Sequence, residues 1–158
     1  MGPKPHLVLY HANCPDGFAA ACVVALFVGD DQCEFRAAQY GGPRPTDEDI
    51  ESRRCVWIVD FSYGVEDMAH IHSRAAALNW TDHHDDALRH EVKARLSSLI
   101  QVDFAMMFDP AECGATATWK LCEQADELPA LMPSILQYVR DRDLWKWELP
   151  YSKEFSAS

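Results

Sequence analysis

Two adjacent histidines between acids form the stretch of the sequence best suited to chemistry. Asp82, His83 and His84 follow a short apolar run and precede two more acids, Asp85 and Asp86. Imidazole and carboxylate together are the ligands with which proteins bind Mn²⁺, Zn²⁺ or Fe²⁺. A solvated helix start, with Asp85 and Asp86 in its first turn, explains the same residues. The stretch alone leaves both interpretations open.

Similar side chains follow two earlier apolar segments. His11 and Asp16 lie in a turn-rich stretch after residues 6–10, and Asp60 directly follows residues 55–59. An acid at the exit of a buried strand is costly unless it is paired or bound to a cation. Asp60 could instead cap the next helix, but the buried strand before it favours a ligand role.

A late segment adds two more acids. Asp141 and Asp143 alternate with Arg140 and Arg142, a pattern that can form a surface ion-pair ladder of little energetic value. The flanking side chains indicate burial instead, and buried acids need a cation or an arginine partner; these neighbours are Tyr138, Leu144, Trp145 and Trp147.

The elements that must position these groups alternate between strand and helix. Apolar runs predict strands at 6–10, 33–40, 55–59, 77–81 and 99–104, and periodic patterns predict helices at 18–28, 65–78, 87–96, 114–123 and from 131, with a short one capped by Thr46. This order predicts an α/β, Rossmann-like, mainly parallel sheet with helices on both faces. Parallel strands end at one edge, where their polar groups can converge.

Two features inside these elements have simpler explanations. His70 and His72 are two residues apart, do not share a helix face and are expected to be surface or partly packed side chains. Gly114 and its small neighbours begin a helix whose N–H groups could hold a phosphate, although close packing is the more economical explanation.

The composition of the chain excludes several classes of function. The chain has 158 residues, enough for one domain with a core, and no apolar run approaches the roughly 20 residues of a membrane span. The formal net charge of −11 argues against a protein whose main role is to bind long nucleic acid. Six scattered cysteines without a CxxC pair indicate reduced thiols and a cytoplasmic location.

Electrostatic repulsion decides what the converging acids can do. Two carboxylates about 4 Å apart repel by roughly 4 kcal/mol at an effective dielectric constant near 20. Three or four of them therefore cluster stably only around cations. Aspartate oxygens and histidine nitrogens without thiolate favour Mn²⁺ over a structural zinc site. Two ions bridged by one aspartate would clamp a phosphate and activate a water for attack on phosphorus.

The ordered set His11…Asp16-Gly17, Val59-Asp60-Phe61 and Asp82-His83-His84 resembles the DHH phosphoesterase superfamily. This superfamily holds exonucleases of the RecJ type, oligoribonucleases, cyclic-dinucleotide phosphodiesterases and family II inorganic pyrophosphatases. The resemblance covers nearly the whole chain. It implies a Mn²⁺-dependent phosphodiesterase or phosphohydrolase with two ions, acting on a small phosphorylated nucleotide or short oligonucleotide.

The resemblance also implies a role for each residue. His11 and Asp16 would hold one Mn²⁺, and Asp60 would bridge both ions. His83 would bind the second ion. The catalytic residues would be Asp60, His83 and His84.

Three more residues complete the implied site. Either Asp141 or Asp143 would join His83 on the second ion. Asp82 would orient His83 from behind, and His84 would face the substrate phosphate.

The sequence departs from the superfamily pattern in ways that affect these expectations. Asn13 and Phe18 stand where another acid is expected, so the first ion would bind weakly or through water. We expect residues 1–158 to be a single catalytic domain, without the usual C-terminal substrate-binding domain. A fragment, a minimal form or one partner of an oligomer fits this expectation.

Two other function classes remain. A catalytically degenerate module of the same fold would bind a nucleotide or partner without turnover. The small number of acids in the first motif, His11…Asp16-Gly17, favours this class. A phospho-receiver would use Asp60 at the end of a central strand as its acceptor. That alternative leaves the histidine pair unexplained, and no lysine stands at a convincing final strand end.

Overall fold

One parallel sheet forms the centre of the molecule. The structure, a computed structural model, describes residues 2–99, 103–125 and 131–157. Within these ranges five strands pair in the order β2-β1-β3-β4-β5, and every pairing is parallel. The strands are β1 His6–His11, β2 Cys33–Ala38, β3 Cys55–Val59, β4 Ala77–Asp82 and β5 Asp103–Phe108. The sheet confirms the predicted α/β, Rossmann-like fold.

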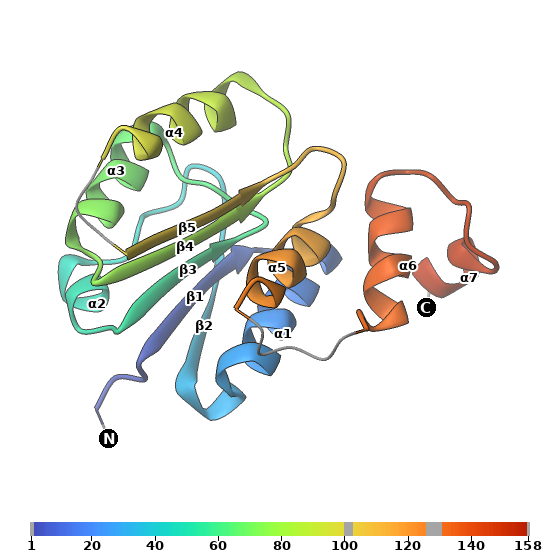
Figure 1. Ribbon diagram of the computed structural model, residues 1–158, viewed down its shortest axis with the longest axis horizontal. Helices are drawn as coiled ribbons and strands as arrows, with labels where there is room; N and C mark the ends of the chain where they lie inside the picture. The colour runs from blue at the N-terminus through green and yellow to red at the C-terminus, as the bar shows by residue number, and fades with distance from the viewer. Residues whose placement is uncertain (1, 100–102, 126–130, 158) are drawn as a thin grey trace.

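Helices cover both faces of the sheet (Figure 1). On one face lie α1 and α5, which pack against each other, and on the other lie α2, α3 and α4. A further pair, α6 and α7, stands beside the first layer, where α6 contacts both α1 and α5. The helices are α1 Pro15–Val28, α2 Asp47–Glu51, α3 Val65–Arg74, α4 Ala87–Ser97, α5 Gly114–Glu123, α6 Ser134–Asp143 and α7 Ser152–Ser156, with a 3₁₀ turn at Asp30–Gln32.

The central strand β3 divides the hydrophobic core into two layers. Its successive side chains point to opposite faces, so Val56 and Ile58 pack with Trp80, whereas Trp57 and Val59 pack in the layer of α1 and α5. All five residues of β3 are buried. The near-continuous apolarity of 55–59 therefore predicted both the bounds and the central place of this strand.

Two other local predictions are confirmed. The strand that begins at Cys33 lies at the edge of the sheet, paired only with β1 among the described strands, although it ends at Ala38 rather than at residue 40. Thr46 caps α2: its hydroxyl accepts the backbone N–H of Asp49, whose carboxylate in turn accepts the N–H of Thr46. This reciprocal capping box stabilises a helix too short to persist alone.

Several boundaries differ from the predictions. Helix α1 begins at Pro15 rather than residue 18, because proline fits the first helical position. Asp16 lies in its first turn, two residues after the N-cap residue Cys14. Helix α3 ends at Arg74 instead of reaching residue 78, because Ala75 adopts an extended backbone before β4 begins.

The later elements shift too. Strand β5 occupies 103–108 instead of 99–104, because its register with β4 aligns residues 103–108 with 77–82. Residues 100–102 of that prediction lie outside the described residues. The last predicted helix begins at Ser134, and α7 was not predicted.

Two expectations from composition can be compared with the structure. No helix in the described ranges is long and apolar enough to cross a membrane. All six cysteines are free thiols, as predicted.

The burial of His72 contradicts the prediction of a surface or partly packed side chain. The residue is 1% exposed, and its ring meets that of Phe104 on β5 edge to face at 5.2 Å. Helix α3 turns this position toward the sheet, whereas it leaves His70 partly exposed beside Asp47. Burial lowers the pKa of His72 below its ordinary value of 6.5.

His72 should therefore make the fold sensitive to acid. Its stabilising contribution is fully present above the unfolded-state pKa of 6.5 and is lost as the pH falls from there through the lowered folded-state pKa. We expect His72→Leu to lose less stability than the wild type between pH 7.5 and 5.5, measured by urea unfolding. Equal losses in both proteins would show that His72 does not titrate with unfolding.

Candidate metal centre

The three inner strands deliver polar side chains to one edge of the sheet. His11 is the last residue of β1, Asp60 directly follows β3, and Asp82 is the last residue of β4, with His83 and His84 next. These strands are parallel neighbours, so their carboxyl ends lie side by side (Figure 1). The predicted convergence of strand-end groups is thus present in the structure.

Three carboxylates surround one ring nitrogen of His83. Its Nε2 lies 3.2 Å from Oδ1 of Asp60, 3.5 Å from Oδ2 of Asp143 and 3.7 Å from Oδ2 of Asp16. The four side chains come from the ends of β3 and β4, the first turn of α1 and the last turn of α6. A convergence of acids and imidazole from four elements is the environment that a divalent cation requires.

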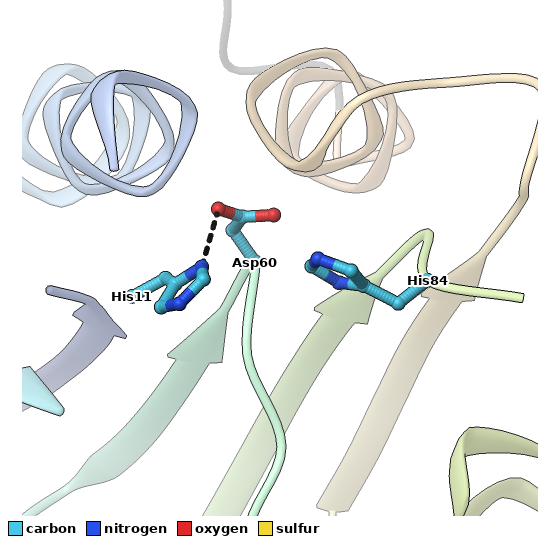
Figure 2. A group of neighbouring side chains, drawn as sticks. All are labelled: His11, Asp60 and His84. Carbon is cyan, nitrogen blue, oxygen red and sulfur yellow. Dashed lines mark ion pairs between the residues drawn. The ribbon is translucent and has the colours of Figure 1, made fainter. Parts of the chain in front are cut away.

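The Asp60 carboxylate lies between His11 and His83. Its second oxygen, Oδ2, is 3.6 Å from Nδ1 of His11 (Figure 2). Asp60 is 0% exposed, and neither of its oxygens has a hydrogen-bond donor among the described residues. A buried carboxylate without hydrogen bonds is costly unless a nearby positive charge, from a metal ion or a protonated histidine, compensates it. Both oxygens are thus available to a metal ion, with His11 and His83 as neighbouring ligands.

Six side chains form two groups that could hold metal ions. Each group offers three ligand atoms within 4.8 Å of one another: His11, Asp60 and His84 in one, and Asp16, His83 and Asp143 in the other. Because Oδ1 of Asp60 also faces His83, Asp60 lies between the groups, where a bridging ligand is expected. The grouping differs from the implied one in two positions: Asp16 lies with His83 rather than His11, and His84 joins His11.

The charges of the cluster shift its proton affinities in opposite directions. Burial, and then the charges of Asp60 and Asp143, raise the pKa of Asp16 to about 7. Burial works against the charge of His83, but the three carboxylates outweigh it and raise its pKa to about 9. Burial also works against the charge of Asp60, but His11 and His83 hold its pKa well below the usual range. Protons thus supply the positive charge that the carboxylates need when no metal is bound.

Asp82 holds the two histidines from behind. It is 0% exposed, and Oδ1 accepts the backbone N–H groups of His83 at 2.8 Å and His84 at 3.2 Å. The same oxygen lies 2.7 Å from Nδ1 of the His84 ring. The expected orienting role is therefore directed at the ring of His84, while His83 is held through its backbone only. This bond leaves Nε2 of His84 available to a ligand.

Two residues that the sequence reasoning missed complete the support of Asp82. The hydroxyl of Ser62 and Nε of Arg89 both donate to Oδ2 of Asp82 at 3.2 Å. Arg89 is 5% exposed and also donates to Asp86, which caps α4. The available signal was an arginine three residues after an acidic helix cap. Asp86 therefore has the helix-start role that was the simpler interpretation of the acidic stretch.

The start of α5 binds a carboxylate of the same chain. The backbone N–H groups of Gly114 and Ala115 donate to the two oxygens of Asp16 at 2.5 and 2.8 Å. The helix end that could have held a phosphate is thus occupied by Asp16. The bonds fix this carboxylate beside His83.

Gly114 also makes room for Asp60. A Cβ at this position would lie 2.4 Å from Cβ and 2.6 Å from Oδ1 of Asp60. At Gly17 a Cβ would lie 2.6 Å from the carbonyl oxygen of His11. Both distances are too short for any side chain, so the two helices reach the cluster only because glycine occupies these positions.

The two acids of α6 have separate roles. Asp143 lies with His83, whereas the carboxylate of Asp141 accepts the backbone N–H groups of Glu148 and Leu149 at 2.9 and 3.3 Å. Asp141 is 5% exposed and braces the turn that follows the helix. Of the two candidates left open by the sequence, Asp143 is the one that the structure brings to the cluster.

Comparisons of the sequence with protein-family models and with curated proteins found no match. The candidate centre is therefore defined by its geometry alone.

Gly114→Ala should displace Asp60 and weaken metal binding. The added methyl group overlaps the Asp60 side chain, so we expect Mn²⁺ affinity to fall at least about tenfold and stability to fall by about 1–3 kcal/mol. Calorimetric titration with Mn²⁺ and chemical unfolding measure the two effects. Gly64→Ala is the matched control, because a Cβ there has no atom within 4 Å. Unchanged Mn²⁺ affinity in Gly114→Ala would contradict the position assigned to Asp60.

Alanine at the two α6 acids should separate metal binding from stability. Asp143→Ala removes one of three crowded carboxylates, so Mn²⁺ affinity should fall more than about 100-fold while the metal-free protein stays at least as stable. Asp141→Ala leaves two backbone N–H groups without their acceptor and should cost about 1–3 kcal/mol of stability. The reverse pattern, with metal affinity lost in Asp141→Ala alone, would reassign the ligand.

Proposed function

We propose that this protein is a Mn²⁺-dependent phosphoesterase of the DHH type that hydrolyses a phosphodiester bond in a short or cyclic nucleotide. The observation that carries the proposal is the Asp60 carboxylate, buried between His11 and His83 with neither oxygen hydrogen-bonded among the described residues. Such a carboxylate is suited to bridging two cations. The ordered resemblance of the three strand-end motifs supports the same class.

The chain's own residues would divide the work of holding the ions. His11, Asp60 and His84 would bind one ion, and Asp16, His83 and Asp143 would bind the other, with Asp60 shared between them. Two divalent cations held by these residues would neutralise phosphate oxygens and lower the pKa of a bound water. The role of the protein is to fix these ligands, at the strand ends and on the adjoining turns of α1 and α6, before substrate arrives.

The hydrogen bonds behind the ligands support precise positioning. The Asp82 carboxylate fixes the tautomer of His84, since an acceptor at Nδ1 keeps that nitrogen protonated and leaves Nε2 as the donor of a lone pair. Arg89 and Ser62 hold Asp82 in turn. Nε2 of His84 can therefore serve the ion of its group or contact a phosphate oxygen, which is the role implied by the resemblance.

One observation favours a binding module of the same fold as the second candidate. The Asp16 carboxylate already accepts two backbone N–H groups from α5, which reduces its capacity for a metal ion. Phe18 also stands where a further acid is expected. In that case the site would bind a nucleotide without hydrolysing it.

Hydrolysis of a 5′-phosphorylated dinucleotide tests the proposal directly. We expect turnover with Mn²⁺, none with a chelator, and a loss of more than about 100-fold in His83→Ala, because that ring meets three of the carboxylates. His90→Ala is the control, since His90 is an exposed histidine that bonds only to Asp85 among the described acids.

Three outcomes decide between the candidates. Turnover lost in His83→Ala but kept in His90→Ala supports the phosphoesterase. Mn²⁺ binding without turnover of the dinucleotide or of a cyclic dinucleotide would favour the binding module. Failure to bind Mn²⁺ would reject the metal centre.

A further inference from the structure

A pocket of about 560 Å³ adjoins the candidate metal centre. One wall is the turn between β1 and α1 with the start of α1, and the other consists of side chains of α6, α7 and the turn after α6. Three of the candidate ligands, His11, Asp16 and Asp143, open onto it. A volume in the range of about 300–1,000 Å³ is typical of small-molecule sites. A ligand bound at the metal centre can therefore extend into this space.

Trp145 presents a large aromatic surface to the pocket. Trp145 lines the cavity and is 76% exposed, whereas the sequence pattern indicated burial of the segment that contains it. Its backbone has φ +57°, a left-handed conformation that bulky residues rarely adopt. Such outliers persist only where the surroundings hold them, and they gather at functional sites.

Asp141 supplies the contacts that hold this turn. Its carbonyl oxygen accepts the N–H groups of Lys146 at 2.9 Å and Trp147 at 3.4 Å, and its carboxylate accepts those of the next two residues. The Trp145 N–H donates to the carbonyl of Arg142 at 2.9 Å. The ring of Trp147 then meets that of Trp145 edge to face at 5.1 Å. The exposed indole is thus anchored on a braced turn.

Arg142 brings a positive charge to the same pocket. It is the single lysine or arginine among the described lining residues, and its side chain makes no hydrogen bond or ion pair within the described part of the chain. Its neighbour Arg140, by contrast, is engaged with Glu112 and the carbonyl of Ala111. The charge of Arg142 acts on the carboxylate of Asp143, but no hydrogen bond or ion pair occupies its guanidinium among the described residues, so the group can bind an anion.

We propose that this pocket binds the base of a nucleotide substrate, with Trp145 stacking on the base and Arg142 pairing with a phosphate oxygen. The proposal rests on the proposed function, because the phosphate must lie at the candidate metal centre. A flat aromatic surface, a free guanidinium and a cluster of metal ligands around one cavity match a molecule with an aromatic base and a phosphate. Inorganic pyrophosphate or polyphosphate would leave the indole without a partner. Substrates with a base are therefore preferred.

Adenosine 5′-monophosphate and ribose 5-phosphate form a matched pair of probes, because they differ only in the base. Calorimetric binding in the presence of Mn²⁺ should show tighter binding of adenosine 5′-monophosphate. Loss of one stacking contact weakens binding by about 5- to 150-fold. Trp145→Ala should weaken binding of the nucleotide by this factor and leave ribose 5-phosphate unchanged, whereas Trp145→Phe should restore most of the loss.

Two further variants separate the base from the phosphate. Arg142→Gln should weaken both ligands by a similar factor, because both carry the phosphate. Tyr151→Ala is the control, since Tyr151 is an 80% exposed aromatic residue on the same segment but does not line the pocket. Far-ultraviolet circular dichroism and urea unfolding of each variant check that the fold is retained.

The outcomes keep this proposal distinct from the proposed function. Equal wild-type affinities for the two probes, or an unchanged nucleotide affinity in Trp145→Ala, would overturn the base pocket even if dinucleotide hydrolysis depends on Mn²⁺. A base-dependent affinity that Trp145→Ala removes supports the pocket. If hydrolysis is then absent, the phosphoesterase is rejected and the nucleotide site remains.

Discussion

Repulsion among clustered carboxylates, two of them fully buried, is the constraint on which the rest of this structure depends. Asp16, Asp60 and Asp143 all approach one nitrogen of His83 within 3.7 Å. The ligand atoms of Asp16 and Asp143 lie within 4.8 Å of each other. At about that separation a pair of like charges costs several kcal/mol, a large share of the roughly 5–15 kcal/mol that stabilises a domain. The pKa values of Asp16 and His83 are raised in the direction that this repulsion and the neighbouring carboxylates require. A bound cation would offset the same cost.

The strands and helices around the cluster hold its acids close together. Parallel strands bring Asp60 and His83 to one edge, and α1 adds Asp16 from its first turn. Gly114 then contributes in two ways, since its N–H holds Asp16 while its missing Cβ leaves room for Asp60. The approach of α5 thus orients two acids with one residue. Free in solution, the repelling carboxylates could move apart. In the fold, backbone atoms that cannot move independently limit the movement of Asp16 and Asp60.

The sequence was most successful in predicting features that depend on residues close together in the chain. The apolar run 55–59 identified the central strand, because full burial on both faces removes the polar alternation, and the acids at strand ends followed from parallel topology. What it could not predict depends on three-dimensional packing. His72 is buried because of the rotation of α3 against the sheet, and Arg89 supports Asp82 across α4 and β4, which no spacing rule relates. The grouping of His84 with His11 likewise depends on the path of the chain after β4.

The end of α6 shows why the choice between Asp141 and Asp143 could not be made from spacing. Residues two apart on a helix point about 200° apart, so only one can face the cluster, but the sequence does not set the rotation of the helix. In the structure Asp143 faces His83, and Asp141 faces the turn that carries Trp145. One helical turn therefore joins a candidate metal ligand to the support of an exposed indole. Any shift of α6 along its axis would move both, which couples the geometry of the metal centre to that of the adjoining pocket.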